Sequence, residues 1–327
     1  MKLFDSSARI GLGGAPLGNM FSPVSDEDAT AAVEAAWDEG WRYFDTAPHY
    51  GLGVAEERLG AALQGKPRDS YVLSSKVGRI IYEGDTPTPD DQGFDMVSTR
   101  RRRWDFSRDG VLRSIEDSLR RIGTDRLDVV FVHDPDDHYE EALAGAFPTL
   151  VELRDQGVIG AIGSGMNQTD MLMRFVRQVD LDVIMLAGRY TVLDPDGLDD
   201  VLPACVENDV QVVAVGVFNS GLLSQPRPAA DATFNYAPAT AELRAKVNQL
   251  ADVCESHGVT LPAVALQFPL AHPAVAGVAV GCRDADQVHT NAALSRVEVP
   301  AGVWSDLRSA GLLRPDAPTP AAPVIAG

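Results

Sequence analysis

Four side chains that can transfer or hold a proton lie at or just after the ends of apolar runs. Asp45 closes the run 41–45, and Tyr50 follows five residues later in the segment DTAPHYG. Lys76 closes the run 71–76, and His133 closes the run 127–133. If these runs are parallel strands, their carboxyl ends share one rim. A carboxylate, a phenol, an ammonium and an imidazole would then meet there.

The chemistry of these four groups is coherent. A phenol has an ordinary pKa of about 10, which must be lowered before it can act near neutrality. A neighbouring ammonium stabilises phenolate, and a carboxylate can hold that ammonium in place. Taken singly, each residue has an ordinary interpretation as a turn cap, a solvated strand end, a surface aromatic or a hydrogen-bonded rim residue. Their coincidence favours a proton-transfer site.

The elements that would position these residues alternate along the whole chain. Eight short apolar runs read as buried parallel strands, at 10–14, 41–45, 71–76, 127–133, 158–163, 183–186, 210–215 and 275–280. Helical segments follow at 26–40, 53–64, 108–122, 138–156, 168–179, 197–208, 239–257 and 284–296. Eight strand-helix units without a linker predict an α/β fold, a (β/α)8 TIM barrel. An open doubly wound sheet stays the alternative.

Three stretches interrupt this rhythm. The polar segments 78–108 and 216–238 each follow a strand, so we expect loops on the functional face of the barrel. The first contains four consecutive arginines, 100–103, which could meet a phosphate or an anionic substrate or pair with nearby acidic groups. We expect one barrel domain over 1–314 and a mobile Pro/Ala-rich tail over 315–327.

Composition limits the possible partners. The 327 residues are 45% hydrophobic and 23% charged, which suits a chain with a sizeable core. The net charge of −19 argues against nucleic acid or an anionic membrane as a partner. The three cysteines form no CxxC pair, and no apolar stretch reaches signal-peptide or membrane-spanning length. We expect a cytoplasmic protein that is either a monomer or a homo-oligomer.

Several motifs together resemble the aldo-keto reductase family over nearly the whole chain. They are DTAPHYG, SSK, FVHD, IGLGG at 10–14, GSGMN at 163–167 and GVAVGCRDADQVHTN in the last strand-helix unit. The resemblance implies a (β/α)8 barrel that binds NAD(P)(H) without a Rossmann domain, transfers hydride directly and needs no metal. It also implies that Tyr50 is the general acid or base, that Lys76 lowers the pKa of Tyr50, and that Asp45 pairs with Lys76. His133 would orient the substrate oxygen or share the proton transfer.

The same resemblance implies residues around the nicotinamide. Ser164 and Asn167 would hydrogen-bond the nicotinamide amide. Tyr190 would stack on the nicotinamide ring, or else belong to the barrel core. The chain departs from the family pattern at 187–189, where Ala-Gly-Arg stands in place of a usual amide side chain.

The remaining predicted cofactor contacts lie where the last strand meets its helix. Gly281 and Arg283 suit a phosphate at a helix N-terminus. Gln287 and Asn291, four residues apart, would face the adenine end. Gly281 and Gln287 stand where many NADPH-specific members have Lys and Arg. We therefore expect NAD rather than NADP, although Arg283 could compensate.

A narrower resemblance concerns the substrate. The segments at 101–107, 186–194 and 217–223 look like the sugar-oxidising branch of the family (L-fucose and D-threo-aldose dehydrogenases), with a pyridoxal dehydrogenase close by. We expect NAD(P)-dependent oxidation of an aldose of the L-fucose or D-arabinose type at C1, giving the lactone. The alternatives are an NADPH-dependent aldehyde or ketone reductase, a pyridoxal 4-dehydrogenase and, from another class, a cofactor-binding regulatory subunit.

Overall fold

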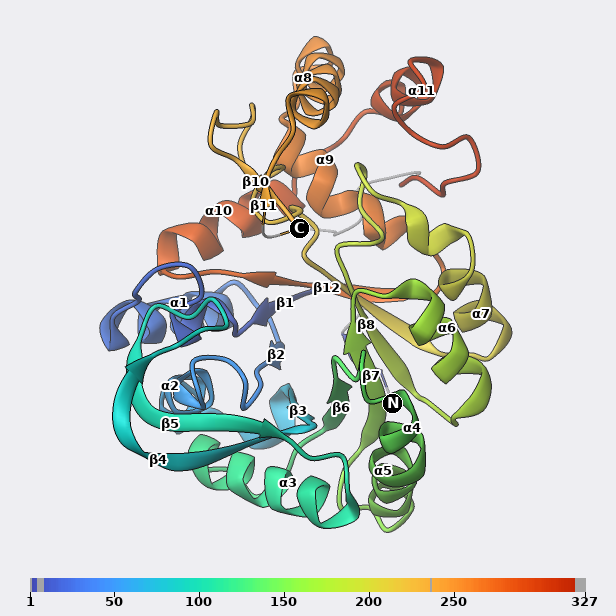
Figure 1. Ribbon diagram of the computed structural model, residues 1–327. Helices are drawn as coiled ribbons and strands as arrows, with labels where there is room; N and C mark the ends of the chain where they lie inside the picture. Colours follow the sequence, from blue (N-terminus) through green and yellow to red (C-terminus); the bar gives the residue numbers. More distant parts are fainter. Residues whose placement is uncertain (1, 5–8, 236, 321–327) are drawn as a thin grey trace.

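The computed structural model describes residues 2–4, 9–235 and 237–320. Eight parallel strands close into a barrel in the order β1-β12-β9-β8-β7-β6-β3-β2, which confirms the predicted fold class (Figure 1). The strands are β1 (Ile10–Gly13), β2 (Tyr43–Asp45), β3 (Val72–Val77), β6 (Val129–His133), β7 (Ala161–Met166), β8 (Val183–Ala187), β9 (Gln211–Val215) and β12 (Val275–Gly281).

Helices form a ring around the barrel. They are α1 (Asp26–Asp38), α2 (Val54–Leu63), α3 (Arg108–Ile122), α4 (Tyr139–Glu141), a π-helical turn (Ala142–Ala146), α5 (Phe147–Asp155), α6 (Thr169–Gln178), α7 (Val201–Glu207), α8 (Ala241–Ser256), α9 (Leu261–Gln267), α10 (Ala285–Ser295) and α11 (Ala301–Ser309). Short 3-10 turns cover Pro16–Gly18, Arg68–Ser70, Asp196–Leu198 and Phe268–Ala271. Among the described residues, no helix combines the length and apolarity needed to cross a membrane.

Strand alternation divides the core into two layers. Odd-numbered residues of β2, β6 and β8 point to the barrel axis, where the lower interior is filled by Tyr43, Val129, Phe131, Val183 and Met185. The even-numbered residues of these strands point outward and pack under the helices. Leu3 and Phe4 join the interior cluster, and the Phe4 ring lies 4.8 Å from that of Tyr43. The barrel is therefore a packed core that is open to ligands only at its rim.

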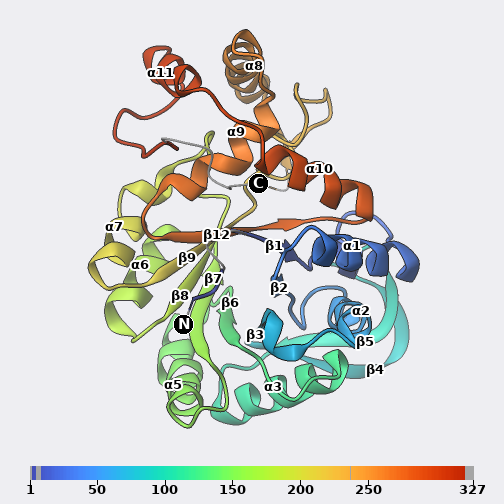
Figure 2. The same ribbon diagram turned by 180° about the vertical axis from the view of Figure 1, so that it is seen from behind.

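Some elements differ from the sequence expectation. The fifth strand runs over Ala161–Met166 instead of 158–163, because pairing of Ala161 with Val129 sets its start and Val158 lies 50% exposed in the preceding turn. The helices α9 and α11 were not predicted. All seven residues of α9 are buried, so the segment shows no polar face and no helical period. In Figure 2, α8 and α11 lie outside α9, away from the strands.

The two long polar segments are partly ordered into hairpins. The segment 78–108 contains an antiparallel pair, β4 (Arg79–Pro89) and β5 (Val97–Trp104), which curves over α2. The segment 216–238 contains two short antiparallel strands of two residues each, β10 (Thr233–Phe234) and β11 (Ala237–Pro238). In the tail, Ala317 is buried and its carbonyl accepts from Arg308, so 315–320 is anchored; 321–327 lie outside the described residues.

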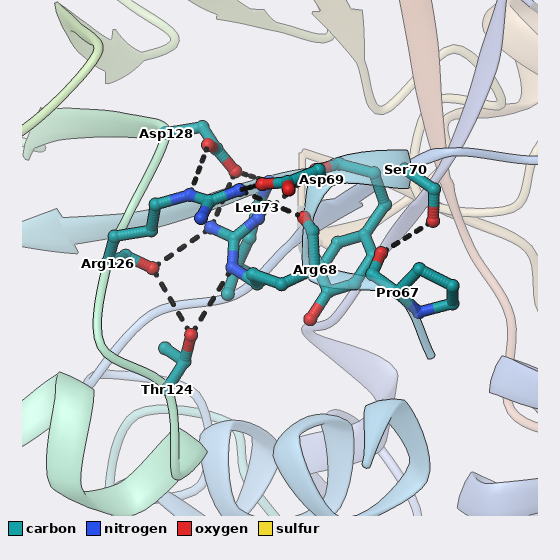
Figure 3. Close-up of polar contacts among 9 residues, drawn as sticks. Pro67, Arg68, Asp69, Ser70, Leu73, Thr124, Arg126 and Asp128 are labelled. Atoms are coloured by element: carbon teal, nitrogen blue, oxygen red, sulfur yellow. Dashed lines mark hydrogen bonds and ion pairs between the residues drawn. The ribbon is translucent and has the colours of Figure 1, made fainter. Parts of the chain in front are cut away.

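Polar contacts tie the barrel together at the amino ends of β3 and β6. Asp128 Oδ2 accepts from Arg68 (2.7 Å) and from the Leu73 backbone N–H (2.8 Å). Arg68 also donates to the Arg126 carbonyl (3.0 Å) and to the Thr124 hydroxyl (3.3 Å), as Figure 3 shows. This cluster lies at the end of the barrel opposite the predicted site. In barrels of this kind that end carries stability rather than chemistry.

Candidate active site

A buried ion pair anchors the site. Lys76 Nζ donates to Asp45 Oδ2 (2.7 Å) and to the Thr46 carbonyl (2.9 Å), and the two charged side chains are 1% and 4% exposed. Ser74 Oγ hydrogen-bonds the other carboxylate oxygen of Asp45 (2.7 Å). Burial raises the pKa of Asp45 and lowers that of Lys76, while their mutual attraction opposes both shifts. Strand alternation explains the geometry, since Asp45, Ser74 and Lys76 all point to the axis.

Tyr50 lies directly against this ion pair. The ammonium of Lys76 is 4.6 Å from the centroid of the Tyr50 ring. The ring of His133 approaches Tyr50 edge-on, with centroids 5.7 Å apart and planes at 90°. The structure thus brings all four predicted proton-transfer residues together. A fixed cation beside a phenol favours its ionised form, which is the property that a tyrosine base requires.

Two histidines beside Tyr50 are held neutral. Burial lowers the pKa of His133 well below 6.5, and the charges of Arg79 and Lys76 act in the same direction. Burial also lowers the pKa of His49 to about 2, assisted by Arg79, Arg102 and Lys76. A neutral imidazole has one donor and one acceptor nitrogen. His133 can therefore hydrogen-bond a substrate oxygen without adding charge.

The hairpin contributes residues that the sequence analysis missed. Phe94, between β4 and β5, is 2% exposed and lies 5.2 Å from the His49 ring and 6.2 Å from the Tyr50 ring. Arg79, the first residue of β4, is buried and pairs with Asp134 (3.1 Å), the residue after His133. His49 carried a usable signal, because it precedes Tyr50 in the quoted motif. Phe94 and Arg79 had none, since each lies in a segment expected to be loop.

The opposite half of the rim is almost without side chains. Gly13 pairs with both Asp45 and Gly281, and Gly165 pairs with His133. Strand alternation also points Ala187 to the axis. These positions carry no bulky side chain. The approach of a flat ring such as nicotinamide to the rim requires this property.

The three residues predicted to contact the nicotinamide lie in different surroundings. Asn167 follows the end of β7 at the rim. Ser164 shares the outward face of β7 with Ile162 and Met166, is fully buried, and lies 3.2 Å from the Val132 carbonyl. Tyr190 is 1% exposed and its ring packs against Phe268 (5.1 Å) and His272 (5.5 Å). Tyr190 has the surroundings of a core residue, which was the alternative stated for it.

The predicted phosphate and adenine contacts gather at the start of α10. Asp284 caps this helix by accepting from the Gln287 N–H (2.8 Å). The Gln287 side chain accepts from the Arg283 N–H (3.1 Å), and Gly281 ends β12 just before. Asn291 is 8% exposed and donates to Cys282 Sγ (3.3 Å), so it lies inside this unit.

The Arg283 guanidinium is already engaged. It donates to the Met20 carbonyl (3.0 Å) and to the Ser22 hydroxyl, both in the loop between β1 and α1. This loop also contacts the hairpin, since the Phe21 N–H donates to the Gly93 carbonyl (3.0 Å). A cation held by two partners is less available to a phosphate than a free one.

Two further observations concern metal binding and a surface cleft. Within the described part of the chain, no three His, Cys, Asp or Glu side chains converge in a way that could hold a metal. A cleft of about 660 Å³ opens on the surface between the Trp104–Arg108 segment and α5. None of the four proton-transfer residues lines it, so this cleft is separate from the site.

The structure is a closed barrel that carries a tyrosine, a buried Asp–Lys pair and a neutral histidine on one rim. The chain belongs to the aldo/keto reductase family, whose model matches residues 9–311. It is therefore an oxidoreductase that acts on CH–OH groups, and NAD(P) use is typical of its family. The resemblance seen in the motifs is thus confirmed.

The proteins similar to this chain agree with the branch of the family that its motifs suggested. The chain is 46% identical to D-threo-aldose 1-dehydrogenase of Pseudomonas sp., with 95% of each chain covered. It is 41% identical to pyridoxal 4-dehydrogenase of Microbacterium luteolum, with 93% of this chain and 94% of the relative covered. Among solved structures, aldo-keto reductase AKR11C1 from Bacillus halodurans superimposes with a TM-score of 0.71 at 26% identity, covering 94% of this chain and 92% of that one.

Proposed function

We propose that the protein oxidises an aldose at its anomeric carbon to the lactone, with NAD⁺ as acceptor. The observation that carries this proposal is the buried Lys76 ammonium, 4.6 Å from the Tyr50 ring and held by Asp45. The identity of 46% with a D-threo-aldose 1-dehydrogenase supports an aldose as the substrate.

The residues act as follows. Tyr50, as phenolate or partly so, takes the proton of the anomeric hydroxyl. Lys76 stabilises the charge on the phenolate, and Asp45 keeps the ammonium in position. His133, neutral, donates a hydrogen bond to the substrate oxygen and orients it. When bound, NAD⁺ would supply the acceptor for the hydride of C1, so that loss of this hydride and of the hydroxyl proton would convert the hemiacetal to a lactone.

The cofactor preference follows from the start of α10. Gly281 and Gln287 offer no cation to a 2′-phosphate. Arg283 is the remaining basic candidate, and its guanidinium donates to Met20 and Ser22. This supports NAD over NADP. Asn167, Gly281 and Gln287 would hold the cofactor, with the small rim residues beside the nicotinamide.

The test is a matrix of initial rates with L-fucose, D-arabinose and pyridoxal, each with NAD⁺ and with NADP⁺. We expect aldose oxidation with NAD⁺ and a lower kcat/KM with NADP⁺. Activity with pyridoxal alone would leave the assignment of the site residues unchanged, but the substrate would be pyridoxal instead of an aldose. Reduction of simple aldehydes by NADPH, without aldose oxidation, would make the protein a reductase. Dinucleotide binding without turnover on any of these substrates would fit a regulatory subunit.

A further inference from the structure

Arg79 lies buried at the barrel mouth with part of its guanidinium unused. It begins β4, three residues after Lys76, and is 8% exposed. One terminal nitrogen donates to Asp134 (3.1 Å), and the guanidinium stacks 4.0 Å over the Trp104 ring. The other terminal nitrogen is buried and has no hydrogen-bond partner among the described residues. Leaving a buried charged donor unpaired is costly, so such a donor is a reason to look for a ligand.

Arg102 repeats this arrangement on the neighbouring strand. In the hairpin, Arg79 pairs with Trp104 and Ile81 pairs with Arg102, so the two arginines share one face. Arg102 is an ion-pair partner of Asp90, and the two side chains are 12% and 3% exposed. Its Nε and one terminal nitrogen are buried without a partner in the described structure.

Both arginines border the reacting centre. The Arg102 guanidinium is 5.7 Å from the Phe94 ring, which packs on His49 and Tyr50. Arg79 adjoins Asp134, the residue that follows His133. The charges of both arginines reach His49, whose buried Nδ1 also lacks a partner among the described residues. Unpaired polar atoms of Arg79, Arg102 and His49 thus lie on the hairpin side of Tyr50, one residue removed from it or beside it.

The local charge indicates what would bind. Each cation at the mouth already faces one carboxylate, in the pairs Lys76–Asp45, Arg79–Asp134 and Arg102–Asp90. The cluster is therefore balanced, and a dianion such as a phosphate would add uncompensated negative charge beside three carboxylates, of which those of Asp45 and Asp90 are buried. The free N–H groups instead call for neutral acceptor oxygens.

We propose that Arg79 and Arg102 bind hydroxyl oxygens of a neutral polyol substrate and thereby determine specificity, favouring a free aldose over a sugar phosphate or a simple aldehyde. This inference rests on the proposed function. Hydrogen bonds from a charged group, each lost with its partner left buried, are worth about ten- to hundredfold in binding.

The experiment compares the variants Arg79→Met and Arg102→Met with wild type. The substrates are L-fucose and its monodeoxy analogues, which are oxidised with NAD⁺. The control substrate is butanal, which has no hydroxyl groups and is reduced by NADH in the reverse direction. We expect kcat/KM for L-fucose to fall about ten- to hundredfold, mainly through KM. Turnover of butanal and the affinity for NAD⁺ should stay near wild type.

Deoxy sugars distinguish a direct hydrogen bond from a structural effect of the substitution. For the hydroxyl that an arginine holds, the losses from the variant and from the deoxy sugar should not multiply, because both remove the same hydrogen bond. Arg103→Met is the matched control: Arg103 is the next residue of β5, is exposed, and shares the opposite face of the hairpin with Ile80. Arg79→Lys retains the charge facing Asp134 but loses the free nitrogen, and serves if Arg79→Met does not fold.

The outcomes are distinct. Equal losses with L-fucose and butanal, or losses that multiply for every deoxy sugar, would refute the arginine assignment while the proposed function stands. A hexose 6-phosphate that is a better substrate than the free hexose would refute the preference for a neutral ligand. Wild type without any aldose oxidation would refute the proposed function and this inference with it.

Discussion

Replacing Lys76 by methionine should slow oxidation and move its pH dependence. The ammonium is 4.6 Å from the Tyr50 ring, so at an effective dielectric constant of about 20 its interaction with a phenolate is worth about 3.6 kcal/mol. This energy corresponds to about 2.6 pKa units. Without Lys76, the pKa that governs the alkaline rise in rate should increase by about two to three units, and the rate below that pKa should fall about 100- to 1,000-fold.

The assay is the initial rate of NADH formation with saturating aldose from about pH 6 to about pH 11. Because Lys76→Met alone leaves the Asp45 carboxylate buried and unpaired, the double variant Asp45→Asn/Lys76→Met is measured beside it. The double variant should fold better and show a smaller shift. Affinity for NAD⁺ is the control and should change little. A Lys76→Met enzyme with the wild-type rate and pH profile would refute this reasoning.

Three further changes have defined outcomes. Tyr50→Phe should lower turnover by at least about 100-fold while NAD⁺ binding persists, and a variant with wild-type turnover would sink the assignment of Tyr50 as base. The folded-state pKa of His133 is depressed, so its contribution makes the free energy of unfolding fall by about 1.4 kcal/mol per pH unit as pH drops below about 6.5. Urea unfolding of His133→Asn should lack this part of the slope, and an unchanged slope would show that His133 titrates normally. Asp128→Ala should cost about 2 kcal/mol in urea unfolding because the Leu73 N–H loses its acceptor, with kcat unchanged; a lower kcat would mean that the cluster in Figure 3 reaches the site.

The barrel and the proton-transfer residues could be predicted because their signals are local. Buried parallel strands read as apolar runs, and a polar residue that ends such a run is conspicuous. Asp45, Lys76 and His133 all end predicted strands, and parallel strands bring those ends to one rim. Their grouping therefore required only the strand order, with no knowledge of side-chain packing.

The rest depends on contacts between distant segments. Arg79 and Arg102 lie in a segment that reads as a polar loop, and their burial arises only when this segment folds into the hairpin beside the rim. Ser164 could not be oriented, because the run around it is apolar and glycine-rich and gives no strand boundary. A shift of one residue moves a side chain from the axis to the outer face. The core position of Tyr190 depends on Phe268, far along the chain.

Transfer of hydrogen from the anomeric carbon is the most direct test of the proposed reaction. Wild-type enzyme is incubated with L-fucose deuterated at C1 and with NAD⁺, and both products are analysed by mass spectrometry and NMR. We expect lactone and reduced cofactor in equal amounts, with the deuterium on the nicotinamide ring of the cofactor. Reduced cofactor without deuterium, or a sugar product that retains it at C1, would contradict oxidation at the anomeric carbon.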